Sequence, residues 1–268
     1  MSQYKIEAGT GQHIGDRQEQ QDRAALFAAP RAPGYMLAVL ADGMGGHSGG
    51  ALAAEQVIHT AKEIFERFSP LTDDPESILH TIAREADTVI KLSAISTEKR
   101  PHSTIVLLML TPEGKAFWGH AGDSRLYQFE GPNFIRRTED HTYQAHLAAQ
   151  NRAQPVPSQN PAVASLLTNF LGGKQQSVKL IVNCHNALQI GDAFLLCSDG
   201  LWQFFSEAEL GAAIATHPPR QACEMLIKKA RERAAGIKAD NCTLAIVKLA
   251  KADIVPQDYK ARAMRRAI

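Results

Sequence analysis

The sequence of 268 residues has only four cysteines, and they lie too far apart to form a structural framework. Cys184, Cys197, Cys223 and Cys242 include no C-x-x-C pair, so the pattern predicts neither a disulfide scaffold nor a thiolate zinc site. A few isolated thiols fit a reducing compartment, because structural disulfides belong to oxidising ones. We therefore expect a cytoplasmic protein.

Long apolar runs and an excess of one charge are also absent. The longest strongly apolar run covers residues 105–110, which is too short to cross a bilayer, and the first residues carry no apolar signal segment. Twenty-nine Lys and Arg balance 28 Asp and Glu, so no overall field favours nucleic acid or anionic lipid. The sequence predicts a protein with no membrane span and no nucleic-acid partner.

The composition is that of an ordinary globular protein, with 44% hydrophobic and 21% charged residues. Apolar residues at helical spacing predict two long amphipathic helices, one from about residue 53 and one that begins after Asp74 as N-cap. Ser206 and Glu209 form a capping box for a third helix, and Pro218-Pro219 precede a fourth. Short apolar runs predict strands at residues 36–41, 105–110, 116–120, 126–129, 178–182, 193–197 and 243–249.

The order of these elements is strands, two helices, more strands, an irregular middle, two helices and a final strand. Because strands and helices do not alternate, we expect an α+β domain with layered helices and largely antiparallel sheets. The polar stretch 15–22 is interpreted as an exposed loop. Residues 151–161 are typical of a linker or a flap, and residues 163–171 resemble an apolar helix.

Four aspartates stand at the ends of apolar runs, each beside a small residue, and they are Asp42, Asp123, Asp199 and Asp240. Any one of them is adequately explained as a turn residue. A sheet could gather all four at one edge, where their charges would repel unless a cation neutralised them. Since no His or Cys group accompanies them, Mg²⁺ or Mn²⁺ fits better than Zn²⁺.

Taken together, the segments resemble the metal-dependent serine/threonine protein phosphatases of type 2C, in particular the bacterial members. The resemblance runs in order from residue 15 to residue 249 and is carried by Arg17 with Gln20-Gln21-Asp22, Ala41-Asp42-Gly43-Met44-Gly45-Gly46-His47, Gly122-Asp123-Ser124-Arg125, Ser198-Asp199-Gly200-Leu201-Trp202 and Asp240-Asn241-Cys242-Thr243. It implies an α/β/β/α sandwich, in which two central antiparallel sheets are flanked by pairs of helices. A centre of two Mn²⁺ or Mg²⁺ ions is expected at one end of this sandwich.

The resemblance also implies roles for single residues. Asp42 matches the residue that bridges the two metals, and Gly43 matches the one that offers its carbonyl oxygen to one of them. Asp199 and Asp240 match ligands of the other metal. The implied chemistry is direct attack of a metal-bridging water on the phosphate, with no phosphoenzyme.

Three further positions complete the implied site. Asp22 matches the residue that holds a metal-bound water, and Asp123 together with Asp199 matches the third, weaker metal site of bacterial members. Arg17 matches the anchor of the substrate phosphate, for which a planar guanidinium is well suited. We therefore expect Arg17, Asp22 and Asp42 to act in catalysis.

Some positions depart from the family pattern or carry a simpler explanation. Gln20 stands where the family usually has Asn, and Met44 stands where many eukaryotic members have a His proposed as general acid. His102-Ser103-Thr104 replaces the usual Gly-Thr-Thr, which we interpret as a packing variation. His47 is explained equally well as a loop residue and as a general acid, and Trp202 is assigned to the core.

The resemblance predicts an enzyme that removes phosphate from phosphoserine and phosphothreonine of proteins. We expect one catalytic domain over residues 1–250, a flap at about 140–172, a basic tail at 251–268, a monomeric state and a cognate kinase pathway. Two alternatives stay open. One is a catalytically weak regulatory or scaffolding member of the same fold, and the other is a two-metal phosphoesterase that acts on small metabolites.

Overall fold

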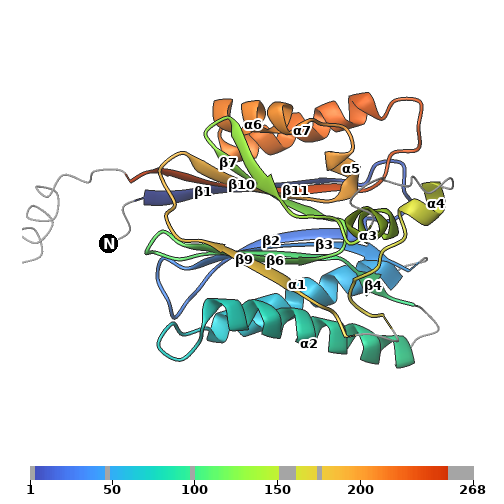
Figure 1. The fold of residues 1–268 in the computed structure, drawn as a ribbon, viewed down its shortest axis with the longest axis horizontal. Helices are drawn as coiled ribbons and strands as arrows, with labels where there is room; N and C mark the ends of the chain where they lie inside the picture. The colour runs from blue at the N-terminus through green and yellow to red at the C-terminus, as the bar shows by residue number, and fades with distance from the viewer. Residues whose placement is uncertain (1–3, 46–48, 97–99, 151–160, 174–176, 253–268) are drawn as a thin grey trace, which may run out of the picture.

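Two antiparallel sheets lie face to face, and helices cover the outer face of each one (Figure 1). The computed structural model describes residues 4–45, 49–96, 100–150, 161–173 and 177–252. One sheet has the strand order β1-β11-β10-β7-β8, and the other has the order β2-β3-β5-β6-β9, with β4 beside β3. The predicted α/β/β/α sandwich is therefore confirmed.

The first sheet consists of β1 (Tyr4–His13), β11 (Cys242–Lys251), β10 (Asp192–Cys197), β7 (Arg125–Glu130) and β8 (Asn133–Arg137). The second consists of β2 (Asp22–Ala28), β3 (Met36–Met44), β4 (His102–Ser103), β5 (Ile105–Leu110), β6 (Ala116–Ala121) and β9 (Ile181–His185). Every pairing in both sheets is antiparallel. This agrees with the arrangement that the order of elements predicts.

Two long helices cover the second sheet, and two others cover the first (Figure 1). The first pair is α1 (Gly49–Arg67) and α2 (Pro75–Ser96), and the second pair is α6 (Glu207–Thr216) and α7 (Pro219–Arg233). Three shorter helices, α3 (Tyr143–Gln150), α4 (Pro161–Ala164) and α5 (Asp199–Trp202), lie toward one end of the sandwich. None of the helices among these residues is both long and apolar enough to cross a membrane.

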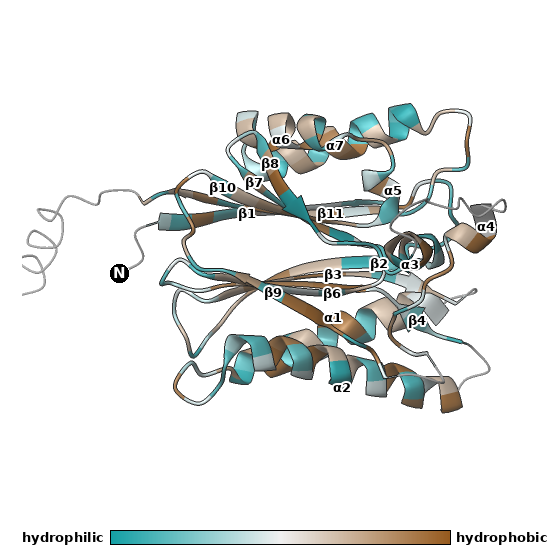
Figure 2. Ribbon diagram, in the orientation of Figure 1, coloured by the Kyte–Doolittle hydropathy of each residue, from teal (hydrophilic) through white to brown (hydrophobic). Residues whose placement is uncertain are grey.

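The central strands are apolar on both faces because each face packs against another layer. In β3, Leu37 and Val39 point toward α1 and α2, whereas Ala38 and Leu40 point toward the opposite sheet. A third cluster, which includes Leu195 and Ile246, fills the space below α6 and α7. The hydrophobic colours of these strands and the mixed colours of the helices show the same layering (Figure 2). Strands buried on both faces have continuous apolar runs, which explains why the sequence marks them.

Local helix signals are confirmed. The Ser206 side chain accepts from the backbone of Glu209, and the Glu209 side chain accepts from the backbone of Ser206, as a capping box requires. The Asp74 carboxylate accepts from the N–H of Ser77 at 2.9 Å, ahead of the first turn of α2. Pro219 is the first residue of α7.

Other parts of the expected secondary structure are wrong. The strands β1, β2 and β8, each at the edge of its sheet, were not predicted. Strands β1 and β8 carry many polar residues, whereas β2 has a short apolar run after Asp22 and Arg23 that was overlooked. Strand β9 begins at Ile181, three residues later than the expected start at Val178. Of the expected apolar helix at residues 163–171, only residues 163–164 are helical, as the end of α4 (Pro161–Ala164). Tertiary pairing decides all of these cases.

Candidate functional site

Five aspartates from both sheets meet at the end of the sandwich where α5 lies (Figure 1). Asp22 and Asp42 are direct neighbours across the β2–β3 pair. Asp123 occupies the turn between β6 and β7, Asp199 is the first residue of α5, and Asp240 precedes β11. The structure thus brings together the four aspartates that the sequence marks at strand ends, and it places beside them Asp22, which the family resemblance assigned to the site.

The charges of these carboxylates interact strongly. Burial raises the pKa of Asp42 well above its usual range, and the charges of Asp22, Asp199, Asp123 and Asp240 raise it further. All four carboxylates therefore lie within electrostatic reach of Asp42.

The same effects act on the neighbours of Asp42. Burial raises the pKa of Asp199 to about 7, with added repulsion from Asp123, Asp240 and Asp22. Burial also raises the pKa of Asp123 to about 6. Carboxylates that repel one another in this way favour binding of a cation, which removes the repulsion.

Asp22 is the most enclosed of the five, with 1% of its surface exposed. Burial raises its pKa to about 6, although a hydrogen bond from Ser198 opposes this shift. The Ser198 hydroxyl donates to Asp22 Oδ2 at 2.7 Å and accepts from the N–H of Thr243 at 3.1 Å. Ser198 therefore links Asp22 of one sheet to β11 of the other.

The backbone of Asp42 is held by the segment that precedes β5. The N–H of Asp42 donates to Thr104 Oγ1 at 3.0 Å, and its carbonyl oxygen accepts from the N–H of Thr104 and from the Ser103 hydroxyl. Thr104 Oγ1 also lies 2.8 Å from the hydroxyl of Ser124, in the turn that carries Asp123. The interpretation of residues 102–104 as a packing variation is incomplete, since two of them position Asp42.

Gly43 lies where no side chain fits. A Cβ atom at this position would stand 2.0 Å from the carbonyl oxygen of Gly50 and 2.7 Å from that of Gln21. The Gly43 N–H donates to Gln21 at 3.2 Å. The start of α1 and the segment before β2 therefore both pack directly against the Gly43 backbone.

Arg17 lies at the edge of the cluster and pairs with Asp240. Its side chain is 50% exposed, and the hydrogen bond to Asp240 raises the pKa of the guanidinium. The stretch 15–22 is only partly an exposed loop, because Asn241 binds it at two points and binds the residue before it at a third. Asn241 accepts from the N–H of Gln21 at 2.7 Å and donates to the carbonyl oxygens of Ile14 and Glu19.

The residues present fit a hard divalent cation. The donors are carboxylate and backbone oxygens, and the mutual repulsion of buried carboxylates is what such an ion relieves. Within the described ranges, no three acidic, His or Cys side chains converge closely enough to hold an ion as they stand. Arg17 and Ser198 hold Asp240 and Asp22, so ion binding requires some of these side chains to turn inward.

Ser103, Thr104, Ser198 and Asn241 support the site, and sequence reasoning assigned none of them a role. Ser198 and Asn241 stand beside the marked residues Asp199 and Asp240, whereas Ser103 and Thr104 stood out only as a departure from the family pattern. Each of the four acts on a segment far away in the sequence. Gln20, which departs from the family pattern, accepts from the N–H of Asp22 at 3.0 Å.

Other marked residues lie around the cluster. Met44 pairs with His102 across β3 and β4. Trp202 is partly buried and packs against the core below α6 and α7, as the core assignment predicted. His47 lies outside the described residues, as do residues 253–268 of the predicted basic tail.

A sandwich of two sheets with a carboxylate cluster at one end is the arrangement of a metal-dependent hydrolase of phosphate esters. The family model described as protein phosphatase 2C matches residues 9–216. The chain therefore belongs to the protein phosphatase 2C family, whose members are metal-dependent enzymes.

Individual proteins show the same relationship. Protein phosphatase PhpP of Streptococcus pneumoniae is 25% identical over 226 residues, which cover 82% of this chain and 88% of that protein. The serine/threonine phosphatase of S. agalactiae shares the fold with a TM-score of 0.80 at 24% identity, over 91% of this chain and 99% of that one. The catalytic domain of the phosphatase PstP, solved with two manganese ions, matches with a TM-score of 0.74 at 23% identity, over 91% of this chain and 98% of that one.

Proposed function

We propose that this protein is a metal-dependent phosphatase that hydrolyses phosphoserine and phosphothreonine in proteins. The observation that carries the proposal is the group of five aspartates gathered from both sheets beside one exposed arginine. Membership of the protein phosphatase 2C family supports the same reaction.

We assign the core site to two ions of Mn²⁺ or Mg²⁺, with a third and weaker site nearby. Asp42 and the Gly43 carbonyl would hold the core ions together with Asp199 and Asp240, and Asp123 with Asp199 would hold the third. When bound, these ions supply an acidified water as nucleophile and neutralise the phosphate charge. The donor set of aspartate and backbone oxygens supports hard ions of this kind.

The chain's own residues then have distinct tasks. Arg17 binds the phosphate through its planar guanidinium, and it must leave Asp240 to do so. Asp22 lies opposite Asp42 and accepts from Ser198, so one of its carboxylate oxygens is held while the other can orient a water. Ser103 and Thr104 fix the backbone of Asp42 and so limit how far its carboxylate can move.

We also propose the domain boundaries, the oligomeric state and the cellular compartment of the enzyme. We assign one catalytic domain to residues 1–250, with a flap at about 140–172 that contributes to substrate choice, and a basic tail at 251–268. We also propose a monomer that opposes a serine/threonine kinase. Four free cysteines, of which Cys197, Cys223 and Cys242 are buried, suit the reducing cytoplasm.

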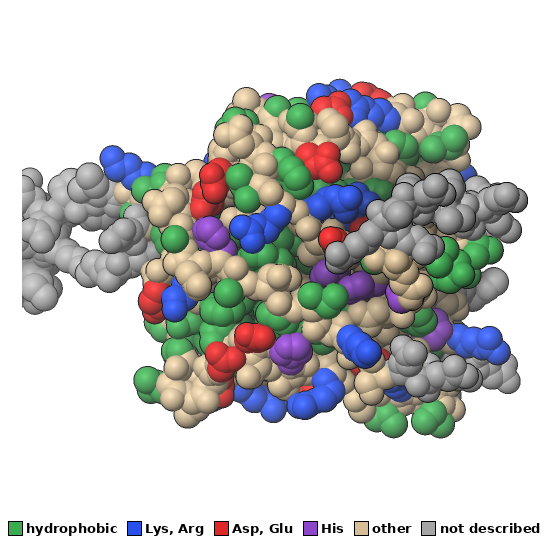
Figure 3. All heavy atoms as spheres, viewed as in Figure 1, with side chains coloured by type: hydrophobic (Ala, Val, Ile, Leu, Met, Phe, Trp, Pro, Cys, Tyr) green, Lys and Arg blue, Asp and Glu red, His purple; other side chains and the backbone are tan. Residues whose placement is uncertain are grey.

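The charged side chains on one face of the molecule are mixed in sign. On the face shown in Figure 3, the described Lys and Arg side chains are interspersed with Asp and Glu, and no broad patch of one sign covers it. Nucleic-acid binding depends on such a patch because the phosphate backbone dominates affinity. Membership of the protein phosphatase 2C family is what supports phosphorylated proteins as the substrates that we propose.

The deciding experiment compares a phosphothreonine peptide with para-nitrophenyl phosphate, each with Mn²⁺ and with excess chelator. We expect Mn²⁺-dependent hydrolysis of both, and a loss of kcat by orders of magnitude in Asp42→Asn and Asp199→Asn with the fold preserved by circular dichroism. Undiminished turnover in chelator would refute the proposed metal dependence. Hydrolysis of para-nitrophenyl phosphate but not of the phosphothreonine peptide would favour a metabolite phosphoesterase. Mn²⁺ binding without hydrolysis of either substrate would favour a regulatory protein.

A further inference from the structure

The turn that carries Asp123 is tied at its start to the segment that enters the flap. The N–H of Gly122 donates to His141 Nδ1 at 3.2 Å, and the N–H of His141 donates to the carbonyl oxygen of Gly122 at 2.9 Å. These two hydrogen bonds join residues that are 19 positions apart. The first residue of the turn therefore cannot move without the flap segment.

The end of the turn is tied to the same segment by an ion pair. Arg125 Nε and Nη2 donate to the two carboxylate oxygens of Asp140, each at 2.7 Å, and Arg125 Nη1 donates to the Tyr127 hydroxyl at 3.1 Å. The Arg125 side chain is 13% exposed and that of Asp140 is 17% exposed. Because both side chains are mostly buried, this two-pronged ion pair fixes both the distance and the orientation of Arg125 relative to Asp140.

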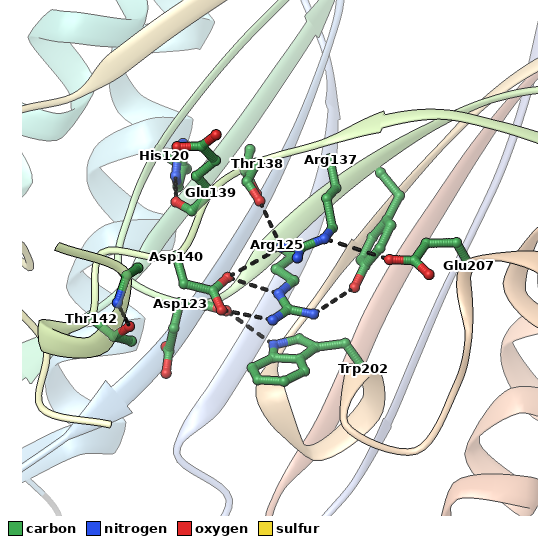
Figure 4. A network of polar contacts seen from close by, with 12 residues as sticks. His120, Asp123, Arg125, Arg137, Thr138, Glu139, Asp140, Thr142, Trp202 and Glu207 are labelled. Atoms are coloured by element: carbon green, nitrogen blue, oxygen red, sulfur yellow. Dashed lines mark hydrogen bonds and ion pairs between the residues drawn. The ribbon is translucent and has the colours of Figure 1, made fainter. Parts of the chain in front are cut away.

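Trp202 connects this turn to the helix that begins at Asp199. Its indole N–H donates to the carbonyl oxygen of Asp123 at 3.0 Å, and its ring lies beneath the Arg125 guanidinium, whose central carbon is 3.4 Å from a ring centroid. Figure 4 shows Arg125 between the Asp140 carboxylate and the Trp202 ring. Since Trp202 is the last residue of α5 and Asp199 the first, one side chain links the segments that carry the two aspartates.

These contacts are more than an ordinary surface ion pair. The chain contains a similar combination at Arg233, which pairs with Glu209 and lies 4.7 Å from the ring of Phe205, but Arg233 is more exposed and contacts none of the five aspartates. The Arg125 group differs because the indole N–H of Trp202, which packs against Arg125, donates to the backbone carbonyl oxygen of Asp123.

We propose that Arg125, Asp140 and Trp202 are positioning residues that hold Asp123 against Asp199 and so set the spacing of the weaker cation site that these aspartates share. We call these three residues the Asp123 brace. Through Asp140 the brace also couples this site to the flap segment. The inference rests on the metal centre proposed above and adds to it the residues that shape one of its sites.

The test measures Mn²⁺ bound by the substrate-free protein, from the electron paramagnetic resonance signal of free Mn²⁺ during a titration. Trp202→Phe keeps the ring beneath Arg125 and removes the indole donor, whereas Arg125→Lys keeps the charge and removes the fork. In each variant we expect the affinity of the weakest class of Mn²⁺ sites to fall at least about fivefold, which is the effect of losing one hydrogen bond. The affinities of the tighter classes should stay unchanged. Arg233→Lys is the matched control and should leave the whole titration unchanged.

A kinetic measurement separates positioning from general damage. At a Mn²⁺ concentration that saturates the tight sites and fills about half of the weakest sites in wild type, both variants should lower kcat for a phosphothreonine peptide and leave KM unchanged. If wild type binds Mn²⁺ and both variants titrate as wild type does, the brace has no such role. Equal weakening of all classes of Mn²⁺ sites also overturns the positioning role of the brace. A wild-type protein that binds no Mn²⁺ refutes the proposed metal centre instead.

Discussion

Ser198 and Asp22 connect the two sheets directly, because the serine hydroxyl at the end of β10 donates to the aspartate carboxylate at the start of β2. Both side chains are buried, with 0% and 1% of their surfaces exposed. The same hydroxyl accepts from the N–H of Thr243 in β11. One oxygen atom therefore fixes a member of the aspartate cluster relative to both layers.

Removal of this hydroxyl should damage the site. In Ser198→Ala, the Asp22 carboxylate loses a donor and the Thr243 N–H loses an acceptor, and a buried group left unpaired costs ~1–3 kcal/mol. We expect a loss of this size in the free energy of unfolding, measured with urea in the presence of Mn²⁺, and a fall in kcat. Thr88→Ala, which removes a hydroxyl bonded to Arg84 on the exposed face of α2, is the control. Equal behaviour of the two variants would contradict the linking role.

The metal-free protein should become less stable as the pH rises. Burial and mutual repulsion raise the pKa of Asp123 and Asp22 to about 6 and that of Asp199 to about 7, whereas an unfolded aspartate titrates near the usual 3.8. Between about pH 4 and 7 the folded state therefore binds more protons than the unfolded state, and stability falls across this window.

The measurement for this prediction is the urea midpoint at several pH values in excess chelator. Asp42→Asn removes the carboxylate on which the charges of all four other aspartates act, so its midpoint should depend less on pH than that of wild type. In saturating Mn²⁺ the sign should reverse, because ligand carboxylates must lose their protons to bind the ion. A metal-free midpoint that rises from pH 4 to 7 would show that the carboxylates do not repel one another as described.

Arg17→Ala should raise KM for a phosphothreonine peptide by about tenfold or more, since a hydrogen bond to a charged group contributes ~1.5–3 kcal/mol. The expected effect falls on KM because Arg17 is placed to bind phosphate and not to transfer protons. Arg17→Lys should recover part of the loss. Arg220→Ala removes an exposed pair with Glu224 on α7 and should leave both constants unchanged. Unaltered KM and kcat in Arg17→Ala would place the residue outside the site.

Gly43→Ala should abolish activity and lower stability, because its Cβ would stand 2.0 Å from the carbonyl oxygen of Gly50. Backbone atoms have to move to relieve such a contact, and the start of α1 would move with them. Gly173→Ala is the control, since the nearest atom to its Cβ would be 3.5 Å away, an ordinary contact. The thermal midpoint and kcat of both variants check the prediction, which fails if Gly43→Ala retains wild-type values.

Gln128→Leu should stabilise the protein. Gln128 is fully buried between the sheets, and neither its side-chain nitrogen nor its side-chain oxygen has a hydrogen-bond partner among the described residues. Replacement by a similar apolar side chain removes a penalty of ~1–3 kcal/mol. Urea unfolding should show this gain with kcat unchanged, whereas the exposed Gln221→Leu should show none. A less stable Gln128→Leu protein would mean that the amide is satisfied.

The sequence by itself determined the features that depend on neighbouring residues. The capping box of Ser206 and Glu209 and the N-cap of Asp74 each act within one turn of helix. The apolar runs of β3, β5 and β10 mark strands that are buried on both faces. Aspartates beside Gly, Ser or Asn at one end of such runs indicated the cluster. In an antiparallel sheet the end of one strand lies beside the start of its neighbour, so aspartates that end one strand and precede another can meet at one edge.

Only the tertiary structure decided the features that join distant segments. Strand β1 carries little apolar signal and exists because all ten of its residues pair with β11. Thr104 supports Asp42 across 62 positions, and Ser198 supports Asp22 across 176. Trp202 reaches Asp123 across 79 positions. The physical reason is that hydrogen bonds and ion pairs depend on distances in space of about 3 Å, and the order of residues along the chain does not encode which distant groups the packed sheets bring that close.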